Sequence, residues 1–163
     1  MSEKKQVIVP IEKIYSKPNK ISELESEALF GEIYNIIDKV GNWIKISNDL
    51  GDSNGWICSK SLSNVNEYTH KLKTLITVVK SEPNIKSTDI SMLTFNSNIN
   101  VIDFHEDWAM FYVTSDDKIQ LGYIPKSSLK MKTFKTNEFA KIARMFINIP
   151  YKWGGRSIFG IDC

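Results

Sequence analysis

The sequence predicts a mostly β fold made of two tandem small β-barrels, followed by a helix and a loop that carries a cysteine. Three observations lead to this prediction. A unit of about sixty residues occurs twice, and each copy consists of short apolar segments between turns. After about residue 133 these short segments give way to a helical pattern of apolar residues. The expected domains are residues 6–65, 66–132 and 133–163, the last an incomplete one.

The repeat is visible in short segments that match between the two halves of the chain. The matched segments are Pro18-Asn19 and Pro83-Asn84, Trp43 and Trp108, and Gly55-Trp56-Ile57 and Gly122-Tyr123-Ile124. The first two pairs are 65 residues apart and the third pair is 67 residues apart. An insertion of two residues in a loop reconciles the two spacings, because loops absorb length changes readily.

Each copy is expected to form short strands in a five-strand meander that closes into a barrel, which removes exposed strand edges. Trp43 and Lys45 alternate with Ile44 and Ile46, as in a half-buried strand. The strands are expected at residues 33–37, 43–46, 55–57, 99–102, 108–113 and 122–124. Because buried aromatic residues dominate small cores, we expect the barrel cores to include Trp43, Trp56 and Trp108.

The helix is expected to begin at Thr136, which can cap it, and to end before Pro150, which cannot continue it. Its apolar residues recur at helical spacing, at positions Phe139, Ile142, Ala143 and Phe146. This apolar face predicts packing against a sheet that residues 1–163 do not supply.

Composition excludes several classes of protein. With 42% hydrophobic and 25% charged residues the chain is expected to be globular, and a net charge of +2 argues against nucleic-acid binding. No apolar run approaches a membrane span. The short apolar run after the charged N-terminus does not resemble a signal peptide, so a cytoplasmic location is the simplest interpretation, with the cell envelope open if a leader was removed. Two cysteines do not make a disulfide framework, and no metal or phosphate motif predicts a cofactor.

Cys163 is the strongest candidate for a catalytic residue. Glycines and aromatic residues precede it, and at the start of a helix its thiolate would be stabilised by free backbone N–H groups. A cysteine nucleophile also needs a base, usually histidine, and His70 and His105 lie far upstream. The neighbouring Asp162 suits either a substrate ammonium or the cap of a following helix. Tyr151 suits either core packing or a hydrogen bond to the reacting group.

The segment that ends in Asp162-Cys163 resembles the start of the NlpC-type cysteine peptidase domain, where a helix leads into Pro-Tyr-x-Trp-Gly-Gly and then Asp-Cys. The matching residues are Pro150, Tyr151, Trp153, Gly154, Gly155, Asp162 and Cys163. The resemblance implies that Cys163 is the nucleophile, that Tyr151 lies at the active site, and that the catalytic histidine and a third polar residue lie beyond residue 163.

The two repeats resemble bacterial SH3-like domains. The segment Leu29-Phe30-Gly31-Glu32 is similar to the corresponding segment of the subgroup that cleaves γ-D-glutamyl-diamino acid bonds in cell-wall peptides. This resemblance, to dipeptidyl-peptidase VI-like enzymes, implies a small peptidoglycan-derived peptide with a free N-terminal L-Ala as the partner. Charge and hydropathy had already argued against nucleic acid and a membrane as partners. The resemblance also implies that Glu32 forms a wall of the substrate pocket. A peptide with a free amine would suit the carboxylate of Asp162, if that carboxylate does not cap a following helix.

A second interpretation stays open at this point. Tandem SH3-like domains without a working catalytic site would bind cell-wall peptides or a protein partner. The preferred diamino acid and the oligomeric state are likewise open.

Overall fold

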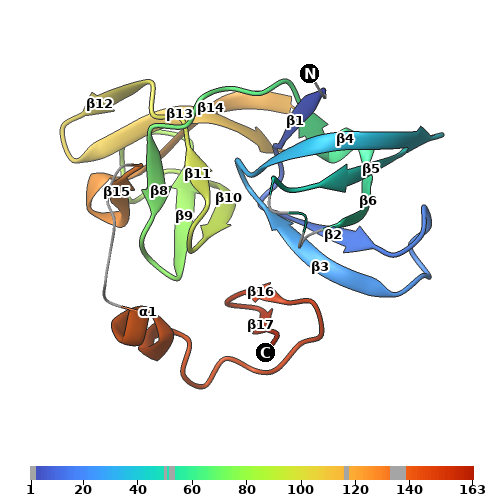
Figure 1. The fold of residues 1–163 in the computed structure, drawn as a ribbon. Helices are drawn as coiled ribbons and strands as arrows, with labels where there is room; N and C mark the ends of the chain where they lie inside the picture. Colours follow the sequence, from blue (N-terminus) through green and yellow to red (C-terminus); the bar gives the residue numbers. More distant parts are fainter. Residues whose placement is uncertain (1–2, 50, 52–53, 116–117, 133–138) are drawn as a thin grey trace.

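The computed structural model describes residues 3–49, 51, 54–115, 118–132 and 139–163 (Figure 1). Strands from the two repeats form two neighbouring units, and the chain then runs beneath both of them through a short helix and a small hairpin (Figure 1). The prediction of a mostly β fold is confirmed.

Seven strands from the first repeat form one sheet in the order β3-β2-β6-β5-β4-β1-β7. Their bounds are β1 Lys4–Val7, β2 Ile11–Tyr15, β3 Leu24–Leu29, β4 Ile33–Val40, β5 Trp43–Ser47, β6 Asn54–Cys58 and β7 Leu62–Ser63, with the 3-10 helix η1 at Ser59–Ser61. This order differs from the predicted five-strand meander. Only β4, β5 and β6 are sequential neighbours at the centre, because β6 pairs back onto β2 and the N-terminal β1 is inserted beside β4.

The second repeat forms two sheets, of order β10-β9-β14-β13-β12 and β11-β8-β15. The bounds are β8 His70–Leu72, β9 Ile76–Lys80, β10 Asp89–Thr94, β11 Asn98–Ile99, β12 Asp103–His105, β13 Trp108–Ser115, β14 Lys118–Pro125 and β15 Leu129–Met131, with η2 at Lys126–Ser128. The strand predicted at 99–102 is wrong. The chain leaves β11 after Ile99 and enters β12 only at Asp103, because the two strands belong to different sheets.

Matched turns show that the two repeats share local geometry. Ser22 Oγ donates to the carbonyls of Lys17 and Asn19 at 3.1 and 2.9 Å. In the second repeat Ser87 Oγ donates to the carbonyls of Glu82 and Asn84 at 3.1 and 2.8 Å. The same turn therefore recurs after 65 residues, at the Pro-Asn segments that the sequence matched.

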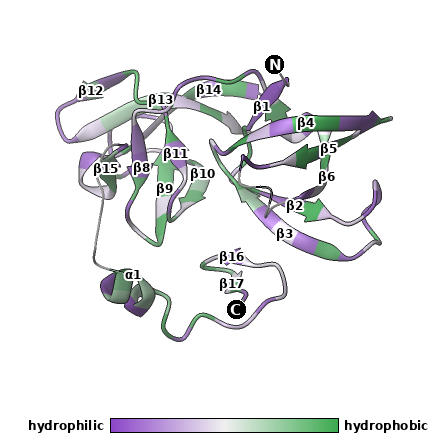
Figure 2. Ribbon diagram, in the orientation of Figure 1, coloured by the Kyte–Doolittle hydropathy of each residue, from purple (hydrophilic) through white to green (hydrophobic). Residues whose placement is uncertain are grey.

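Each repeat has an apolar core, and Phe30 of the first repeat packs into the core of the second. In the first repeat the inward face of β5 carries Ile44 and Ile46, which are 8% and 0% exposed. In the second repeat Ala109 and Phe111 of β13 point inward. Figure 2 shows hydrophobic residues interspersed with hydrophilic ones along these strands.

The prediction that the tryptophans belong to the cores is wrong. Trp43, Trp56 and Trp108 lie on the opposite strand faces and are only partly buried. Trp43 instead packs edge-on against Tyr15, with ring centroids 5.7 Å apart. Alternation in residues 43–46 identified the two faces of β5 correctly, but the face that carries Ile44 and Ile46 packs inward.

The helix α1 covers Phe139–Met145, and Thr136, its predicted cap, lies outside the described residues. It ends before Pro150 is reached, since turn structure follows Met145 and Asn148 adopts a left-handed conformation with φ of 71°. No residue of α1 is buried, and Phe139 is 77% exposed. Among the described residues, no helix has the length and apolar character needed to span a membrane.

Candidate active site

The cysteine loop is a tight hairpin formed by β16 (Arg156–Ser157) and β17 (Gly160–Ile161). Lys152 N donates to the carbonyl of Ile161 at 2.9 Å, and Asp162 N donates to that of Gly155, also at 2.9 Å. A Cβ on Gly160 would lie 2.3 Å from the Cβ of Lys152, so only glycine allows this close approach. The hairpin therefore fixes the backbone that leads into Cys163.

Asp162 holds this loop together through its carboxylate. Its Oδ2 accepts from Gly154 N at 2.7 Å and its Oδ1 accepts from Cys163 N at 2.8 Å. These backbone donors, Gly154 first, hold the pKa of Asp162 below its usual range, and a hydrogen bond from Tyr151 adds to the effect. Asp162 is therefore ionised at neutral pH and is bound by the loop that it stabilises.

Tyr151 is joined to the same carboxylate. Its backbone forms a bridge with Ile161, and its side chain is 65% exposed. Desolvation, and then the hydrogen bond and charge of Asp162, raise the pKa of the Tyr151 phenol. The phenol consequently stays protonated at neutral pH and can act as a hydrogen-bond donor.

Cys163 is exposed and lines an open pocket of about 460 Å³ with Asp162, Arg156 and Phe146. The structure thus brings three of the four predicted site residues together, Cys163, Asp162 and Tyr151. Neither His70 nor His105 lines this pocket.

The loop is fastened to the first repeat by a buried carboxylate, Glu27 of β3, which is 2% exposed. Its side-chain oxygens accept from Arg156 N at 3.0 Å and form an ion pair with Lys152. Its backbone carbonyl accepts from the Arg156 guanidinium at 2.7 Å. Nearby, Trp153 Nε1 donates to the carbonyl of Leu24 at 2.8 Å. These hydrogen bonds therefore hold the cysteine loop against β3.

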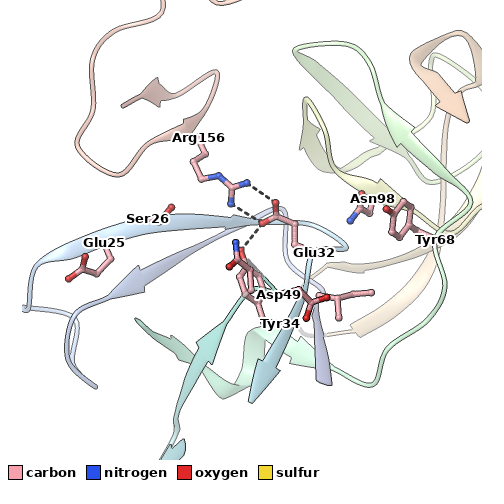
Figure 3. A pocket seen from close by; sticks show the side chains of 10 residues that line it. Glu25, Ser26, Glu32, Tyr34, Asp49, Tyr68, Asn98 and Arg156 are labelled. Atoms are coloured by element: carbon pink, nitrogen blue, oxygen red, sulfur yellow. Dashed lines mark hydrogen bonds and ion pairs between the residues drawn. The ribbon is translucent and has the colours of Figure 1, made fainter. Parts of the chain in front are cut away.

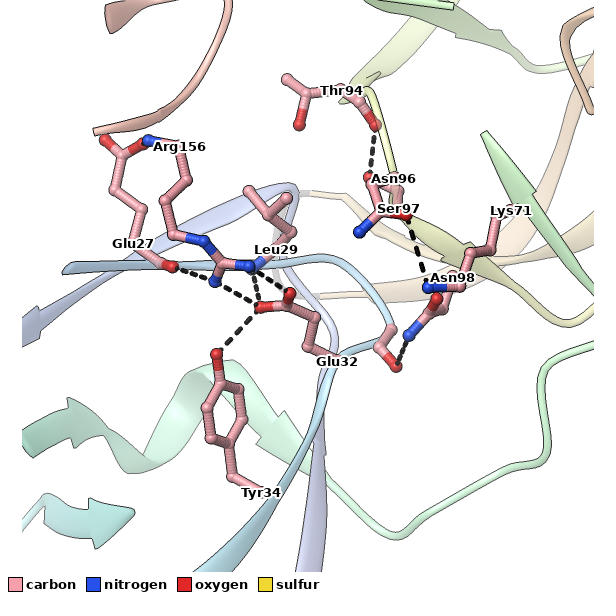
Figure 4. A network of polar contacts seen from close by, with 11 residues as sticks. Glu27, Leu29, Glu32, Tyr34, Lys71, Thr94, Asn96, Ser97, Asn98 and Arg156 are labelled. Carbon is pink, nitrogen blue, oxygen red and sulfur yellow. Dashed lines mark hydrogen bonds and ion pairs between the residues drawn. The ribbon is translucent and has the colours of Figure 1, made fainter. Parts of the chain in front are cut away.

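Glu32 lies at the centre of the same network (Figure 4). Its two carboxylate oxygens accept from the Arg156 guanidinium at 3.0 and 2.7 Å. Glu32 also accepts from Tyr34 Oη and from Leu29 N, each at 2.9 Å. Burial, and then the charge of Glu32, raise the pKa of Tyr34, so its phenol remains a donor to the carboxylate.

A cavity of about 690 Å³ lies beside this network and is lined by both repeats and the loop (Figure 3). Glu32, Tyr34 and Arg156 line this cavity, as do Tyr68 and Asn98 of the second repeat. Glu32 therefore lines a cavity, but not the pocket that Cys163 lines, and Arg156 is shared by the two.

The two repeats meet at Gly31, which follows β3 with φ of +78°. Asn98 N donates to the carbonyl of Phe30 at 2.9 Å, and Asn98 Nδ2 donates to that of Gly31 at 3.1 Å. A Cβ on Gly31 would lie 2.1 Å from the Asn98 carbonyl oxygen, so the contact requires glycine. The matching position in the second repeat, Asn96, is also left-handed, with φ of 68°.

Glu27 and Arg156 are the functional candidates that the sequence prediction missed. Their partners lie far away in the sequence, so no local spacing connects them. One sequence feature does point to Glu27, which directly precedes the apolar segment Ala28-Leu29-Phe30. A charge at the edge of a buried run usually has a partner.

Two curated proteins are similar to the chain over most of its length. The first is a gamma-D-glutamyl-L-lysine dipeptidyl-peptidase from Bacillus cereus (strain ATCC 10987 / NRS 248), which is 26% identical over 87% of the chain and 48% of the relative. The second is a dipeptidyl-peptidase 6 from Lysinibacillus sphaericus, 26% identical over 96% of the chain and 64% of the relative. The resemblance to NlpC-type peptidases is confirmed.

Solved structures of NlpC/P60 proteins share the fold. The chain superimposes on an NlpC/P60 family protein from Bacillus cereus ATCC 10987 with a TM-score of 0.76 and 17% identity, over 99% of the chain and 69% of that protein. An NlpC/P60 endopeptidase from Photobacterium damselae subsp. piscicida gives a TM-score of 0.60 and 17% identity, over 94% of the chain and 39% of that protein. No family model matches the chain. The chain spans 48% and 64% of the length of the two curated relatives.

Proposed function

We propose that this protein is a cysteine peptidase that hydrolyses the bond between γ-D-Glu and a diamino acid in peptidoglycan-derived peptides with a free N-terminal L-Ala. The observation that carries the proposal is the exposed Cys163 at the end of a hairpin that Asp162 and Glu27 hold in place. The similarity to a gamma-D-glutamyl-L-lysine dipeptidyl-peptidase from Bacillus cereus supports the substrate class.

In the proposed reaction the Cys163 thiolate attacks the γ-carbonyl carbon of D-Glu, and a tetrahedral intermediate forms. A histidine takes the thiol proton and delivers it to the amine of the departing diamino acid as the C–N bond breaks. Water then hydrolyses the thioester and restores the thiol. We assign the histidine to a part of the protein outside residues 1–163, since His70 and His105 do not line the pocket at Cys163.

The neighbouring residues suit different parts of such a peptide. Asp162 is ionised, and each of its carboxylate oxygens has lone pairs beyond those used by Gly154 N and Cys163 N, so it can also accept from the peptide's ammonium. Tyr151 is a protonated phenol beside it and can donate to the reacting carbonyl. The charge of Glu32 is already paired with Arg156, which supports a role as a pocket wall and not as a free anionic site.

The test uses the full-length protein and the peptide L-Ala-γ-D-Glu-L-Lys, with release of lysine followed by mass spectrometry. Cys163→Ala is expected to abolish hydrolysis, whereas Cys58→Ala, the matched control at the other free cysteine, is expected to retain it. Acetylation of the L-Ala amine is expected to slow hydrolysis strongly. Hydrolysis that persists in Cys163→Ala would overturn the proposal, and peptide binding without any hydrolysis by the unmodified protein would favour a binding module instead.

A further inference from the structure

Two lysines of the second repeat face each other across neighbouring strands. Lys71 of β8 is the direct register partner of Lys130 of β15, so both side chains stand on the same face of this three-stranded sheet. Lys132 follows shortly after Lys130 and places its Nζ 4.4 Å from the centre of the Tyr68 ring. We call Lys71, Lys130 and Lys132 the lysine face.

Within the described part of the chain no acidic side chain forms an ion pair with the lysine face, although the charge of Glu32 acts on Lys71. Lys71 is half-buried, and its hydrogen bond within the described residues is to the neutral amide oxygen of Asn96, at 3.3 Å (Figure 4). Burial, and then the charge of Lys130, lower the pKa of Lys71, and the charge of Glu32 offsets part of this effect. Like charges directly opposite each other destabilise a sheet, and a bound anion would relieve this.

Aromatic contacts connect this face to the pocket at Cys163. Lys130 Nζ lies 5.3 Å from the centre of the Phe95 ring. Phe95 packs edge-on against Phe146, with ring centroids 5.5 Å apart, and Phe146 lines the pocket that contains Cys163. The lysine face is thus two aromatic rings away from the nucleophile, which is within the reach of a few extended residues of peptide, each about 3.3–3.6 Å long.

From this geometry we infer that the lysine face binds a carboxylate on the part of the substrate beyond the scissile bond. The inference rests on the proposed function and names a specificity site for it. Ammonium groups beside aromatic rings, with an amide oxygen fixing one of them, form a site for a carboxylate, because charge-assisted hydrogen bonds are the strong ones.

Two sources could provide this carboxylate. One is the C-terminal carboxylate of the peptide. The other is the distal side-chain carboxylate of diaminopimelate, which lysine lacks. The α-carboxylate of D-Glu is present in every candidate peptide, so it contributes equally to binding of each and does not affect the comparison between them.

The experiment measures kcat/KM of the full-length protein for three peptides. The first is L-Ala-γ-D-Glu-L-Lys-D-Ala-D-Ala amide, which has no carboxylate beyond the scissile bond. The second is the same peptide with a free C-terminal carboxylate, and the third is the amide in which diaminopimelate, with its distal carboxylate free, replaces L-Lys. We expect at least one of the two carboxylate peptides to be preferred about tenfold over the amide, and the double substitution Lys71→Gln and Lys130→Gln to remove that preference. Which peptide is preferred identifies the source.

The matched control is Lys86→Gln, which removes one exposed charge from a loop of the same repeat and is expected to leave the preference intact. Equal kcat/KM for all three peptides, or a preference that survives the double substitution, would overturn the inference while leaving the proposed peptidase intact. Failure of the proposed function has a different signature, which is no hydrolysis of any peptide. In that event the inference is tested by calorimetric titration of the three peptides into the Cys163→Ala protein. Equal affinity for the peptides with and without a carboxylate beyond the scissile bond would overturn it.

Discussion

Arg156 and Glu32 form a bidentate ion pair across 124 residues of sequence, with N–O distances of 2.7 and 3.0 Å. Arg156 belongs to the hairpin that ends in Cys163, and Glu32 belongs to the first repeat. Glu27 adds a second attachment, to Lys152 and to the backbone N–H of Arg156. The position of Cys163 relative to the large cavity is therefore set by the first repeat.

Replacing Glu27 by Ala is expected to loosen this attachment. The substitution leaves Arg156 N and the Lys152 ammonium without their buried acceptor, which costs about 1–3 kcal/mol of docking free energy. Hydrogen exchange at the Arg156 amide should accelerate about tenfold to hundredfold. The measurement is hydrogen–deuterium exchange resolved to residues 152–157.

The control for this prediction is Glu25→Gln on the same strand, where the side chain is exposed. Exchange at Arg156 should be unchanged in that variant. Equal protection of Arg156 in the Glu27→Ala and unmodified proteins would contradict the view that Glu27 anchors the hairpin.

Replacing Gly31 by Ala is expected to disrupt the junction between the repeats. The new Cβ would lie 2.1 Å from a backbone oxygen of Asn98, and this oxygen cannot move without breaking the contact. Gly41→Ala is the matched control, because Gly41 is also left-handed, with φ of +55°, but its Cβ would meet nothing within 4 Å. The control should cost about 1–2 kcal/mol of unfolding free energy from backbone strain alone.

Gly31→Ala should cost a further 1–3 kcal/mol or so for overpacking, measured by urea denaturation of both variants. Equal losses of stability would mean that the close approach of Gly31 and Asn98 is not required for folding. Because Asn98 also lines the large cavity, the same substitution is expected to alter that cavity.

Local pattern predicted much of the fold. Alternation in residues 43–46 identified the strand β5 and its two faces, and the matched Pro-Asn segments identified turns that the structure repeats with the same hydrogen bonds. The periodicity of two does not determine which face is buried, and this is why the prediction for Trp43 failed. The apolar residues at helical spacing likewise did not determine that α1 ends at Met145.

The candidate site was predictable only in part, for a different reason. Cys163, Asp162 and Tyr151 belong to one short motif, so they were found together. Glu27 and Arg156 contact each other because the chain folds back onto β3, and nothing in the residues beside either one specifies the other. The same holds for the pairing of Lys71 with Lys130, which depends on strand register.

Cys163 is expected to react with iodoacetamide faster than Cys58. Cys163 is exposed, whereas Cys58 at the end of β6 is partly buried. Limited alkylation at neutral pH, followed by mass spectrometry of the two cysteine peptides, compares the two rates within one sample. Equal alkylation would show that the thiol of Cys163 is shielded in the full-length protein, and a nucleophile in an open pocket would then be excluded.

Protonation of Asp162 is expected to release the cysteine loop at low pH. The backbone N–H groups of Gly154 and Cys163 bind the ionised carboxylate, and they hold its pKa below the ordinary value of 3.8. Because the pKa in the folded state is the lower one, the carboxylate's contribution is fully present above pH 3.8 and is lost as the pH falls through the folded-state pKa. The amide proton shift of Gly154, followed by NMR, should therefore titrate with a midpoint below pH 3.8.

The substitution Asp162→Asn should abolish this titration while keeping an acceptor for Gly154 N, since the amide oxygen of Asn does not ionise in this range. Glu25→Gln, at an exposed carboxylate on β3, should leave the midpoint unchanged. A Gly154 midpoint above 3.8 would mean that the backbone donors do not favour the charged form. Asp162 would then be free of the loop, and its two hydrogen bonds could not be what positions Cys163.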